Sequence, residues 1–343
     1  MLLALLLSPV LALRPVLQSA ETSSTEAVAI DAYLRRCVPF GFSGQLVVER
    51  DGEILLEGSY GWADREAGTP DTADTAFGAA SMTKPFVAAA ILLLQQEGKL
   101  RVDEPAGRTV SLPEDKQGIL LGQLLTHTSG LPYSVASDDW EVSDPAEVGR
   151  RLRSAPLESV PGERWEYSGA GYNLLVEVIE AVTGRPYEDF VRERLLVPAG
   201  MTRSGFLHGA VPIAPPLARC VWREHDEGDP RAWPLDALLR GAGDLFTTAG
   251  DLRRWEQALR AGSILAPNTV AELLAPRVAI QERVDYGFGW FDTRSRDGVR
   301  TTEHGAPPRS RPSCGARVAR PSRSSTGTTT PSRASTSIAP SRT

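Results

Sequence analysis

Alternating apolar and polar positions predict β-structure at both ends of the folded part of the chain. The segments "SGQLVVER" and "EILLEGSYG" flank Asp51-Gly52, and alternation around an Asp-Gly pair is typical of a β-hairpin. Close to residue 300, "DYGFGWFDT" and "GVRTTEH" predict two antiparallel strands joined by a turn at Asp297-Gly298. The regular pattern therefore opens and closes with strands.

The residues between these strands have a helical period instead. The run from Ser81 to Glu97 predicts a helix that stops at Gly98, and "GYNLLVEVIEAVTG" predicts one that stops at Gly184, since glycine readily terminates helices. Further helices are expected at 118–126, 145–154 and 187–196, in "TTAGDLRRWEQALRAG" and in "APNTVAELLAP". This order predicts an α+β fold, in which an antiparallel sheet from the chain ends accompanies a helical region inserted between them.

The first twenty residues, "MLLALLLSPVLALRPVLQSA", form an apolar run that Pro9 and Arg14 interrupt. It is too short and too broken for a stable membrane span. We interpret residues 1–20 as a signal peptide, which implies export to the periplasm or the cell exterior. A start codon assigned upstream of the real one is the alternative.

The last 38 residues, 306–343, depart from any folded pattern. They contain nine Ser, six Thr, six Pro and seven Arg, with one Val and one Ile, too little apolar surface to offset the entropy of ordering. We interpret 28–305 as the folded domain and 306–343 as a low-complexity basic tail, produced by a frameshift near codon 306. A natural disordered tail is the alternative. A domain made as written would lack its closing strands, with poor solubility and weak activity.

Charge argues against a nucleic-acid partner. The formal net charge of the 343 residues is −6, and without the seven tail arginines the chain carries 30 basic and 43 acidic residues. A phosphate-binding surface needs clustered Lys and Arg. The cysteines and histidines have no metal-ligand spacing, so no metal or other cofactor is implied.

Ser81 and Lys84 are the strongest candidates for chemistry. A spacing of three on a helix places the hydroxyl and the amine on one face. Pro85 is tolerated only in the first helical turn, so the helix must begin close to Ser81. Partial burial and the positive end of the helix would lower the pKa of Lys84 and allow it to act as a base. A capping serine beside a solvated lysine is the alternative.

Neighbouring segments strengthen the catalytic interpretation. The chain resembles the serine β-lactamase and penicillin-binding-protein superfamily, in its class C-like branch, from about residue 42 to 305. The resemblance is carried by "FGAASMTKPF", "LLTHTSGLP", "WEYSGAGYNLLVEVIEAVTG", "VPAGMT", "GAGDLFTTAGDLRRW" and "YGFGWF".

The resemblance implies that Ser81 is the acylated nucleophile and Lys84 its partner. Tyr167 in "EYSG" matches the tyrosine that acts as a general base, with a pKa lowered by the ammonium. The third position of that motif is often an asparagine that holds the substrate, and here it is Gly169, as in esterase and aminopeptidase-like members.

Two further segments resemble parts of the same site. His304 and Gly305 match the start of the third motif, on a strand that lines the substrate pocket, although the motif is not completed. In "THTSGLP", His127 could be a catalytic base, but the resemblance favours a structural turn beneath the site.

We therefore expect a serine hydrolase that forms an acyl-enzyme with an ester, a D-amino-acid peptide or a β-lactam, such as an esterase or a D-Ala-D-Ala carboxypeptidase-like enzyme. Its partner would be a small-molecule or peptide substrate, and the oligomeric state is left open. The alternative is a non-catalytic penicillin- or peptide-binding relative, or a pseudoenzyme inactivated by its tail.

Overall fold

The computed structural model describes residues 25–136, 142–219, 221–222, 225–226, 228–304 and 318–322. They belong to two compact units, 1–73 and 74–343, which are treated one at a time. The expected signal peptide lies outside the described residues, so export stays a prediction.

The first unit contains a helix and a β-hairpin. Helix α1 (Thr25–Cys37) and a 3₁₀ turn (Val38–Phe40) precede strands β1 (Gly44–Arg50) and β2 (Glu53–Tyr60), which pair antiparallel. Asp51 and Gly52 both have positive φ angles, 53° and 86°, as a type I′ hairpin turn requires. The predicted hairpin is confirmed.

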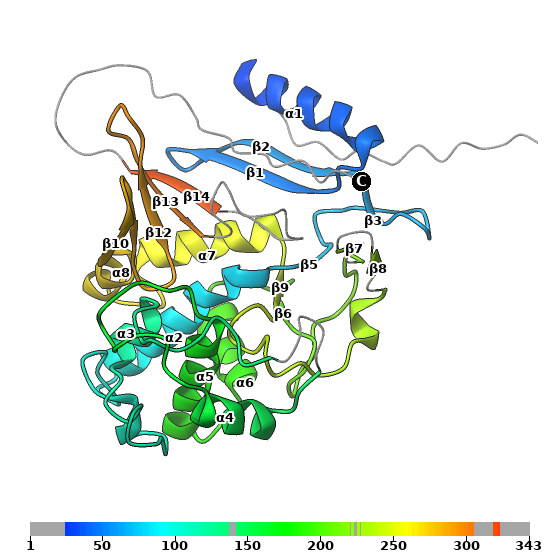
Figure 1. The fold of residues 1–343 in the computed structure, drawn as a ribbon. Helices are drawn as coiled ribbons and strands as arrows, with labels where there is room; N and C mark the ends of the chain where they lie inside the picture. Colours follow the sequence, from blue (N-terminus) through cyan, green and yellow to red (C-terminus); the bar gives the residue numbers. More distant parts are fainter. Residues whose placement is uncertain are drawn as a thin grey trace, which may run out of the picture. The chain divides into compact units, whose positions relative to one another are not determined.

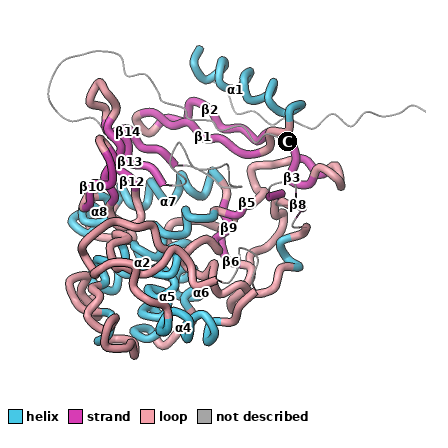
Figure 2. The backbone as a smooth tube through the Cα atoms, in the orientation of Figure 1, coloured by secondary structure: helices cyan, strands magenta, loops and turns pink. Residues whose placement is uncertain are grey.

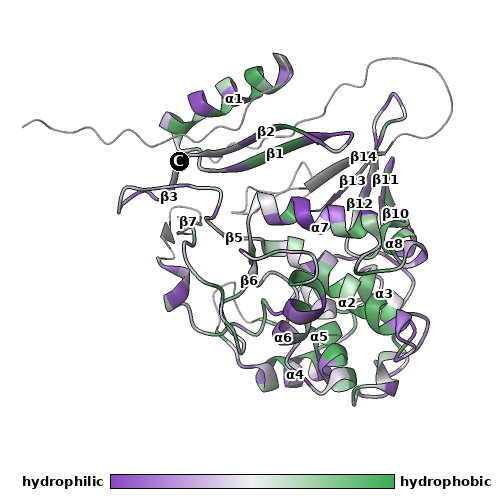
Figure 3. Ribbon diagram, turned by 180° about the vertical axis from the view of Figure 1, so that it is seen from behind, coloured by the Kyte–Doolittle hydropathy of each residue, from purple (hydrophilic) through white to green (hydrophobic). Residues whose placement is uncertain are grey.

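The second unit has a helical core around α2 (Lys84–Gln96) and α5 (Gly169–Thr183) (Figure 1). Every side chain of α2 from Lys84 to Leu94 is buried. A helix with apolar side chains on every face is stable only where all of its faces are removed from water. In Figure 3 the ribbon around the labels α2 and α5 is coloured mainly as hydrophobic.

Local signals account for both ends of α5, whereas two other expected helices differ in the structure. Gly184, with a φ of 66°, ends α5, and the Ser168 side chain caps its start by accepting from the Gly171 N–H at 3.0 Å. The helix expected from Ser81 begins three residues later, at Lys84, because Ala80–Thr83 form a 3₁₀ turn. The helix expected at 187–196 changes to a π-helical turn at Arg192.

The described helices and strands of the second unit are shown along the backbone in Figure 2. Besides α2 and α5, the helices are α3 (Leu121–Leu125), α4 (Pro145–Ser154), α6 (Tyr187–Val191), α7 (Ala249–Ala261) and α8 (Pro267–Leu274), with 3₁₀ turns at Ala106–Arg108 and Pro230–Ala232. A small antiparallel sheet has the order β5 (Phe77–Gly78), β9 (Leu245–Thr247) and β6 (Gly205–Phe206), and β7 (Val221–Trp222) pairs with β8 (His225–Asp226).

The larger sheet consists of five consecutive antiparallel strands. They are β10 (Val278–Gln281), β11 (Val284–Tyr286), β12 (Phe291–Arg294), β13 (Arg300–His304) and β14 (Val318–Ser322). The turn at Asp297-Gly298 is confirmed, but "DYGFGWFDT" is not one strand. It folds into the β11–β12 hairpin because Gly287 N–H donates to the Trp290 carbonyl at 2.8 Å and Gly289 has a φ of 82°.

Strand β14 comes from the segment that we interpreted as a low-complexity tail. Its backbone pairs with β13 from His304–Val318 to Arg300–Ser322. Strand pairing uses backbone groups, so a polar sequence can form it. The domain boundary at 305 and the frameshift stay predictions. The α+β class with antiparallel sheets is confirmed, whereas the joining of β1–β2 to the C-terminal strands in one sheet stays a prediction.

Gly289 links the C-terminal sheet to the start of α2, and this contact gives a stability prediction. A Cβ on Gly289 would lie 3.0 Å from the Pro85 nitrogen, whereas a Cβ on Gly298 meets nothing within 4 Å, although the φ angles are 82° and 84°. We expect Gly298→Ala to cost about 1 kcal/mol from left-handed strain alone. Gly289→Ala should cost at least ~2 kcal/mol more, because backbone must move. Thermal melts of the two variants check this, and equal melting temperatures would contradict it.

Candidate active site

Ser81 lies on a tight turn that precedes α2. Ala80 has a φ of 47°, a conformation that non-glycine residues adopt rarely and that is concentrated at functional sites. The Thr83 hydroxyl donates to the Ala80 carbonyl at 2.8 Å and accepts from the Leu245 N–H at 3.1 Å. Strand β9 thereby holds the turn in its conformation.

Lys84 follows one turn later and is almost completely buried, with 1% of its surface exposed. Its Nζ lies 3.3 Å from Ser81 Oγ and donates to the Ala242 carbonyl at 2.7 Å. Burial lowers the pKa of Lys84 to about 7, and the nearby Asp244 carboxyl opposes that shift. At neutral pH a large fraction of the amine is therefore unprotonated, as a base requires.

Tyr167 also contacts the nucleophile, because its hydroxyl donates to Ser81 Oγ at 2.8 Å. The Lys84 Nζ lies 4.9 Å from the centre of the Tyr167 ring. Burial raises the pKa of the Tyr167 phenol to about 12, although the hydrogen bond to Ser81 opposes the shift. The lowered pKa implied by the resemblance is therefore wrong for the unliganded site, because desolvation outweighs the hydrogen bond.

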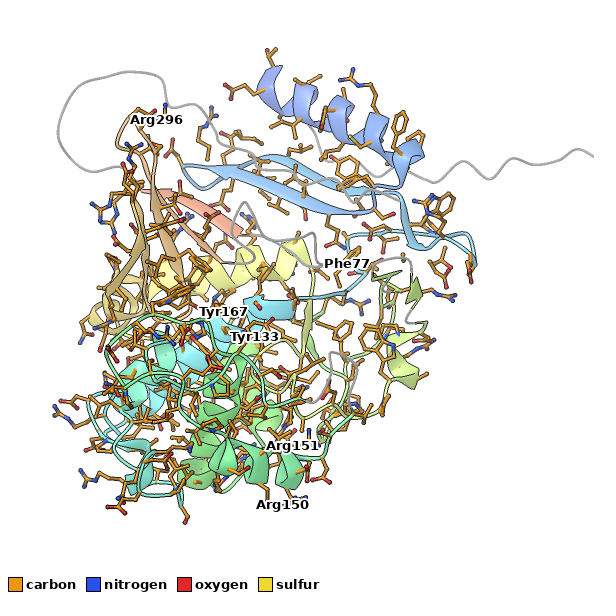
Figure 4. All side chains as sticks on the ribbon, in the orientation of Figure 1. Phe77, Tyr133, Arg150, Arg151, Tyr167 and Arg296 are labelled. Atoms are coloured by element: carbon orange, nitrogen blue, oxygen red, sulfur yellow. The ribbon has the colours of Figure 1, made fainter. Side chains whose placement is uncertain are left out.

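Gly169 is the first residue of α5, and its N–H donates to the Tyr133 carbonyl at 2.8 Å. A Cβ there would lie 3.2 Å from that carbonyl and 3.8 Å from the Ala242 Cβ. A side chain at this position would thus be crowded by the loop that carries Tyr133. Figure 4 shows the Tyr133 side chain beside Tyr167, and their ring centres are 6.1 Å apart.

The structure does not describe how the His304 side chain and Gly305 lie relative to the site. His304 is the last residue of β13, its side chain is not among those described, and Gly305 lies outside the described residues. Their substrate-binding role stays a prediction.

Sequence reasoning missed two groups that contact or influence Lys84. A backbone carbonyl such as that of Ala242 leaves no signal in a sequence. Desolvation raises the pKa of the half-buried Asp244 to about 7, and its Oδ1 accepts from the Gly241 N–H at 3.1 Å in the turn that carries Ala242. An acidic residue in an otherwise apolar "GAGDLF" is the signal that could have found it.

A cavity of about 420 Å³ lies on the loop that leads to Tyr167. It is lined by Thr128, residues 162–165 and strand β10 residues 278–280.

In the described part of the chain, no group of three His, Cys, Asp or Glu side chains has the arrangement of a metal site. No helix among these residues has the length and apolar character needed to cross a membrane.

Comparison with known proteins identifies the family of the chain. The Beta-lactamase family matches residues 42–328. The chain belongs to this family. The confirmed resemblance explains the antiparallel sheets and the inserted helices, which the solved structures of relatives share.

Two curated relatives illustrate the range of the family. Esterase EstB from Burkholderia gladioli is 34% identical over 285 residues, covering 71% of this chain and 72% of EstB. PbpX from Bacillus subtilis is 29% identical over 262 residues, covering 76% of this chain. That match spans 64% of PbpX, so the chain covers less than two thirds of this relative.

Two solved structures show the same fold. The octameric penicillin-binding protein homologue from Pyrococcus abyssi superimposes with a TM-score of 0.68 at 27% identity, covering 81% of this chain and 66% of the other. The D-amino acid amidase from Ochrobactrum anthropi SV3 gives 0.66 at 26% identity, covering 80% and 86%. Relatives in this family thus include esterases, penicillin-binding proteins and amidases.

The burial of Lys84 predicts an unusual titration. We expect the amine to titrate near pH 7, because desolvation disfavours the charged form. NMR of protein labelled with ¹³C at the lysine Cε would follow it, since the chain has only three lysines, Lys84, Lys99 and Lys116. Lys84→Met assigns the signal, and a Lys84 signal that stays fully protonated up to pH 9 would contradict the prediction.

Proposed function

We propose that the protein is a serine hydrolase that forms an acyl-enzyme at Ser81, with esters as its preferred substrates. The observation that carries the proposal is the position of Ser81 Oγ, 2.8 Å from the Tyr167 hydroxyl and 3.3 Å from Lys84 Nζ. A nucleophile within reach of both a base and a proton donor is the arrangement that acyl transfer needs.

The proton path follows from the two pKa shifts. The neutral Lys84 amine takes the Ser81 hydroxyl proton while Oγ bonds to the substrate carbonyl carbon. The bond to the leaving group then breaks, and the leaving oxygen takes the phenolic proton of Tyr167. The Lys84 ammonium returns a proton to Tyr167, so the site is restored apart from the acyl group. Deacylation reverses these steps: water attacks the acyl carbon while one of its protons passes through Tyr167 to Lys84, and Ser81 Oγ then leaves with the proton that Lys84 returns.

The preference for esters rests on Gly169 and on the relatives. Gly169 offers no side-chain amide to a substrate, and the crowding by the Tyr133 carbonyl leaves little space for one. EstB, an esterase, is 34% identical to this chain. Amides of D-amino acids are the second candidate, because the structurally similar Ochrobactrum anthropi enzyme is a D-amino acid amidase.

Turnover with and without Ser81 tests the proposal. We expect the protein to hydrolyse 4-nitrophenyl butyrate and to be labelled by a fluorophosphonate at one residue per chain. Ser81→Ala should abolish labelling and reduce kcat/KM by about 10⁴-fold or more. Ser154→Ala, on the exposed surface of α4, is the matched control and should retain full activity.

Other outcomes of this experiment separate the alternatives. Faster turnover of D-phenylalaninamide than of the ester would favour the amidase, and faster turnover of a chromogenic cephalosporin would favour a β-lactamase. Labelling by fluorescent penicillin without turnover would indicate a penicillin-binding relative. Neither labelling nor turnover would indicate an inactive protein.

The pH dependence of the reaction tests the assignment of the base. Lys84 must be neutral to accept a proton, so kcat/KM should rise with pH through about 7. At pH 5, two pH units below the pKa of Lys84, about 1% of the amine is neutral, so kcat/KM should be about 100-fold lower than on the plateau. Tyr167 keeps its proton up to about pH 12, so the plateau should extend beyond pH 9. Rates measured against a Ser81→Ala blank check this, and a flat profile from pH 5 to 9 would contradict it.

A further inference from the structure

His127 forms hydrogen bonds with the two residues that flank Tyr167 in the sequence. The His127 carbonyl accepts from the Glu166 N–H at 2.8 Å, and its Nδ1 accepts from the Ser168 N–H at 3.1 Å. The residues immediately before and after Tyr167 are therefore both bound by one histidine. The His127 ring also lies against the Tyr167 ring, with their centres 4.3 Å apart.

The hydrogen bonds of His127 assign its tautomer. Because Nδ1 accepts a backbone N–H, the ring proton is on Nε2, which lies 3.0 Å from the Tyr286 hydroxyl and donates to it. Both ring nitrogens are thus occupied at a side chain that is only 1% exposed. This arrangement gives His127 contacts to Tyr167 rather than a place beside Ser81, so the alternative of His127 as the base has no support in the geometry.

Several aromatic rings hold the imidazole in place. Tyr286 of β11, fully buried, has its ring centre 4.9 Å from that of His127, and Tyr172 of α5 lies 5.2 Å away on the same measure. Trp165 meets the imidazole edge-on at 6.1 Å. His127 itself has a φ of 59°, a conformation in which only a few residue types are common. The imidazole is therefore fixed by groups from α5, from the Trp165 loop and from the C-terminal sheet.

We propose that His127 is a positioning residue that aims the Tyr167 hydroxyl at Ser81 and the leaving group, and that Tyr286 holds His127 in the tautomer that does so. This inference rests on the proposed function, because it assigns the part that Tyr167 plays in proton transfer. A misplacement of about 1 Å in a reacting group can reduce a rate by about 10²-fold. The contacts of His127 with Tyr167 and its two neighbours in the chain therefore affect the rate of proton transfer directly.

Two substitutions separate the contacts of His127. His127→Asn tolerates the left-handed backbone and places an amide oxygen where Nδ1 accepts the Ser168 N–H, but it removes the ring contact with Tyr167 and the bond to Tyr286. Tyr286→Phe removes one hydroxyl, the partner of Nε2, and keeps every ring. Thr126→Val is the control, because Thr126 is a buried neighbour in the chain whose hydroxyl donates to the Gly122 carbonyl at 2.8 Å.

The readout is the dependence of the defect on the leaving group. A misaimed Tyr167 should harm expulsion of ethoxide, which needs a proton, much more than expulsion of 4-nitrophenolate, which hardly needs one. For His127→Asn we expect kcat to fall by about 10²-fold with an ethyl ester and about tenfold with the 4-nitrophenyl ester, while KM changes less than about twofold. Tyr286→Phe should show the same selectivity at about tenfold with the ethyl ester, and Thr126→Val should show none.

The outcomes distinguish this inference from the proposed function. The role of His127 would be overturned by equal losses of kcat on both esters, or by no loss. It would also be overturned if Thr126→Val, at the same melting temperature, showed the same loss. Each of these results would leave Ser81 as the nucleophile of an active enzyme. A wild-type protein without turnover or labelling would overturn both. Near-UV circular dichroism and thermal melts establish that each variant is folded. If His127→Asn does not fold, Tyr286→Phe carries the test, because it deletes a single atom.

Discussion

Burial of the Lys84 amine is the constraint on which the rest of the site depends. Helix α2 is apolar on every side, and packing it fully inside the molecule leaves the lysine with 1% of its surface exposed. A desolvated ammonium is unfavourable unless it is paired, so the pKa falls to about 7 and the neutral amine becomes available as a base. The Ala242 carbonyl then satisfies Nζ and holds it within 3.3 Å of Ser81 Oγ.

The same desolvation acts in the opposite sense on Tyr167. Burial favours the neutral form of both groups, which makes the amine a better base and keeps the phenol, with a pKa of about 12, protonated. One environment thus prepares a proton acceptor and a proton donor on either side of a single hydroxyl. In this arrangement the two residues have distinct parts in the proposed acyl transfer.

Distant parts of the second unit hold this arrangement. Strand β9 supports the Ser81 turn through the Leu245 N–H bond to Thr83, and the Gly289 turn approaches the backbone of Pro85. Tyr286, on β11 of the five-stranded sheet, is hydrogen-bonded to His127, and His127 in turn binds the backbone next to Tyr167. The C-terminal strands thereby support the site from several directions, although the histidine expected on β13 has no described side chain.

The sequence by itself determined what depends on neighbouring residues. The hairpin at Asp51-Gly52, the end of α5 at Gly184 and the spacing that joins Ser81 to Lys84 are local, because turn chemistry and helical periodicity act over a few residues. Tertiary structure alone decided the direction of the Tyr167 pKa, the carbonyl that binds Lys84 and the task of His127. It also decided the break within residues 284–294, where Gly289 turns against Pro85. Desolvation and close backbone approach are sums over groups that the fold brings together, and no local pattern encodes them.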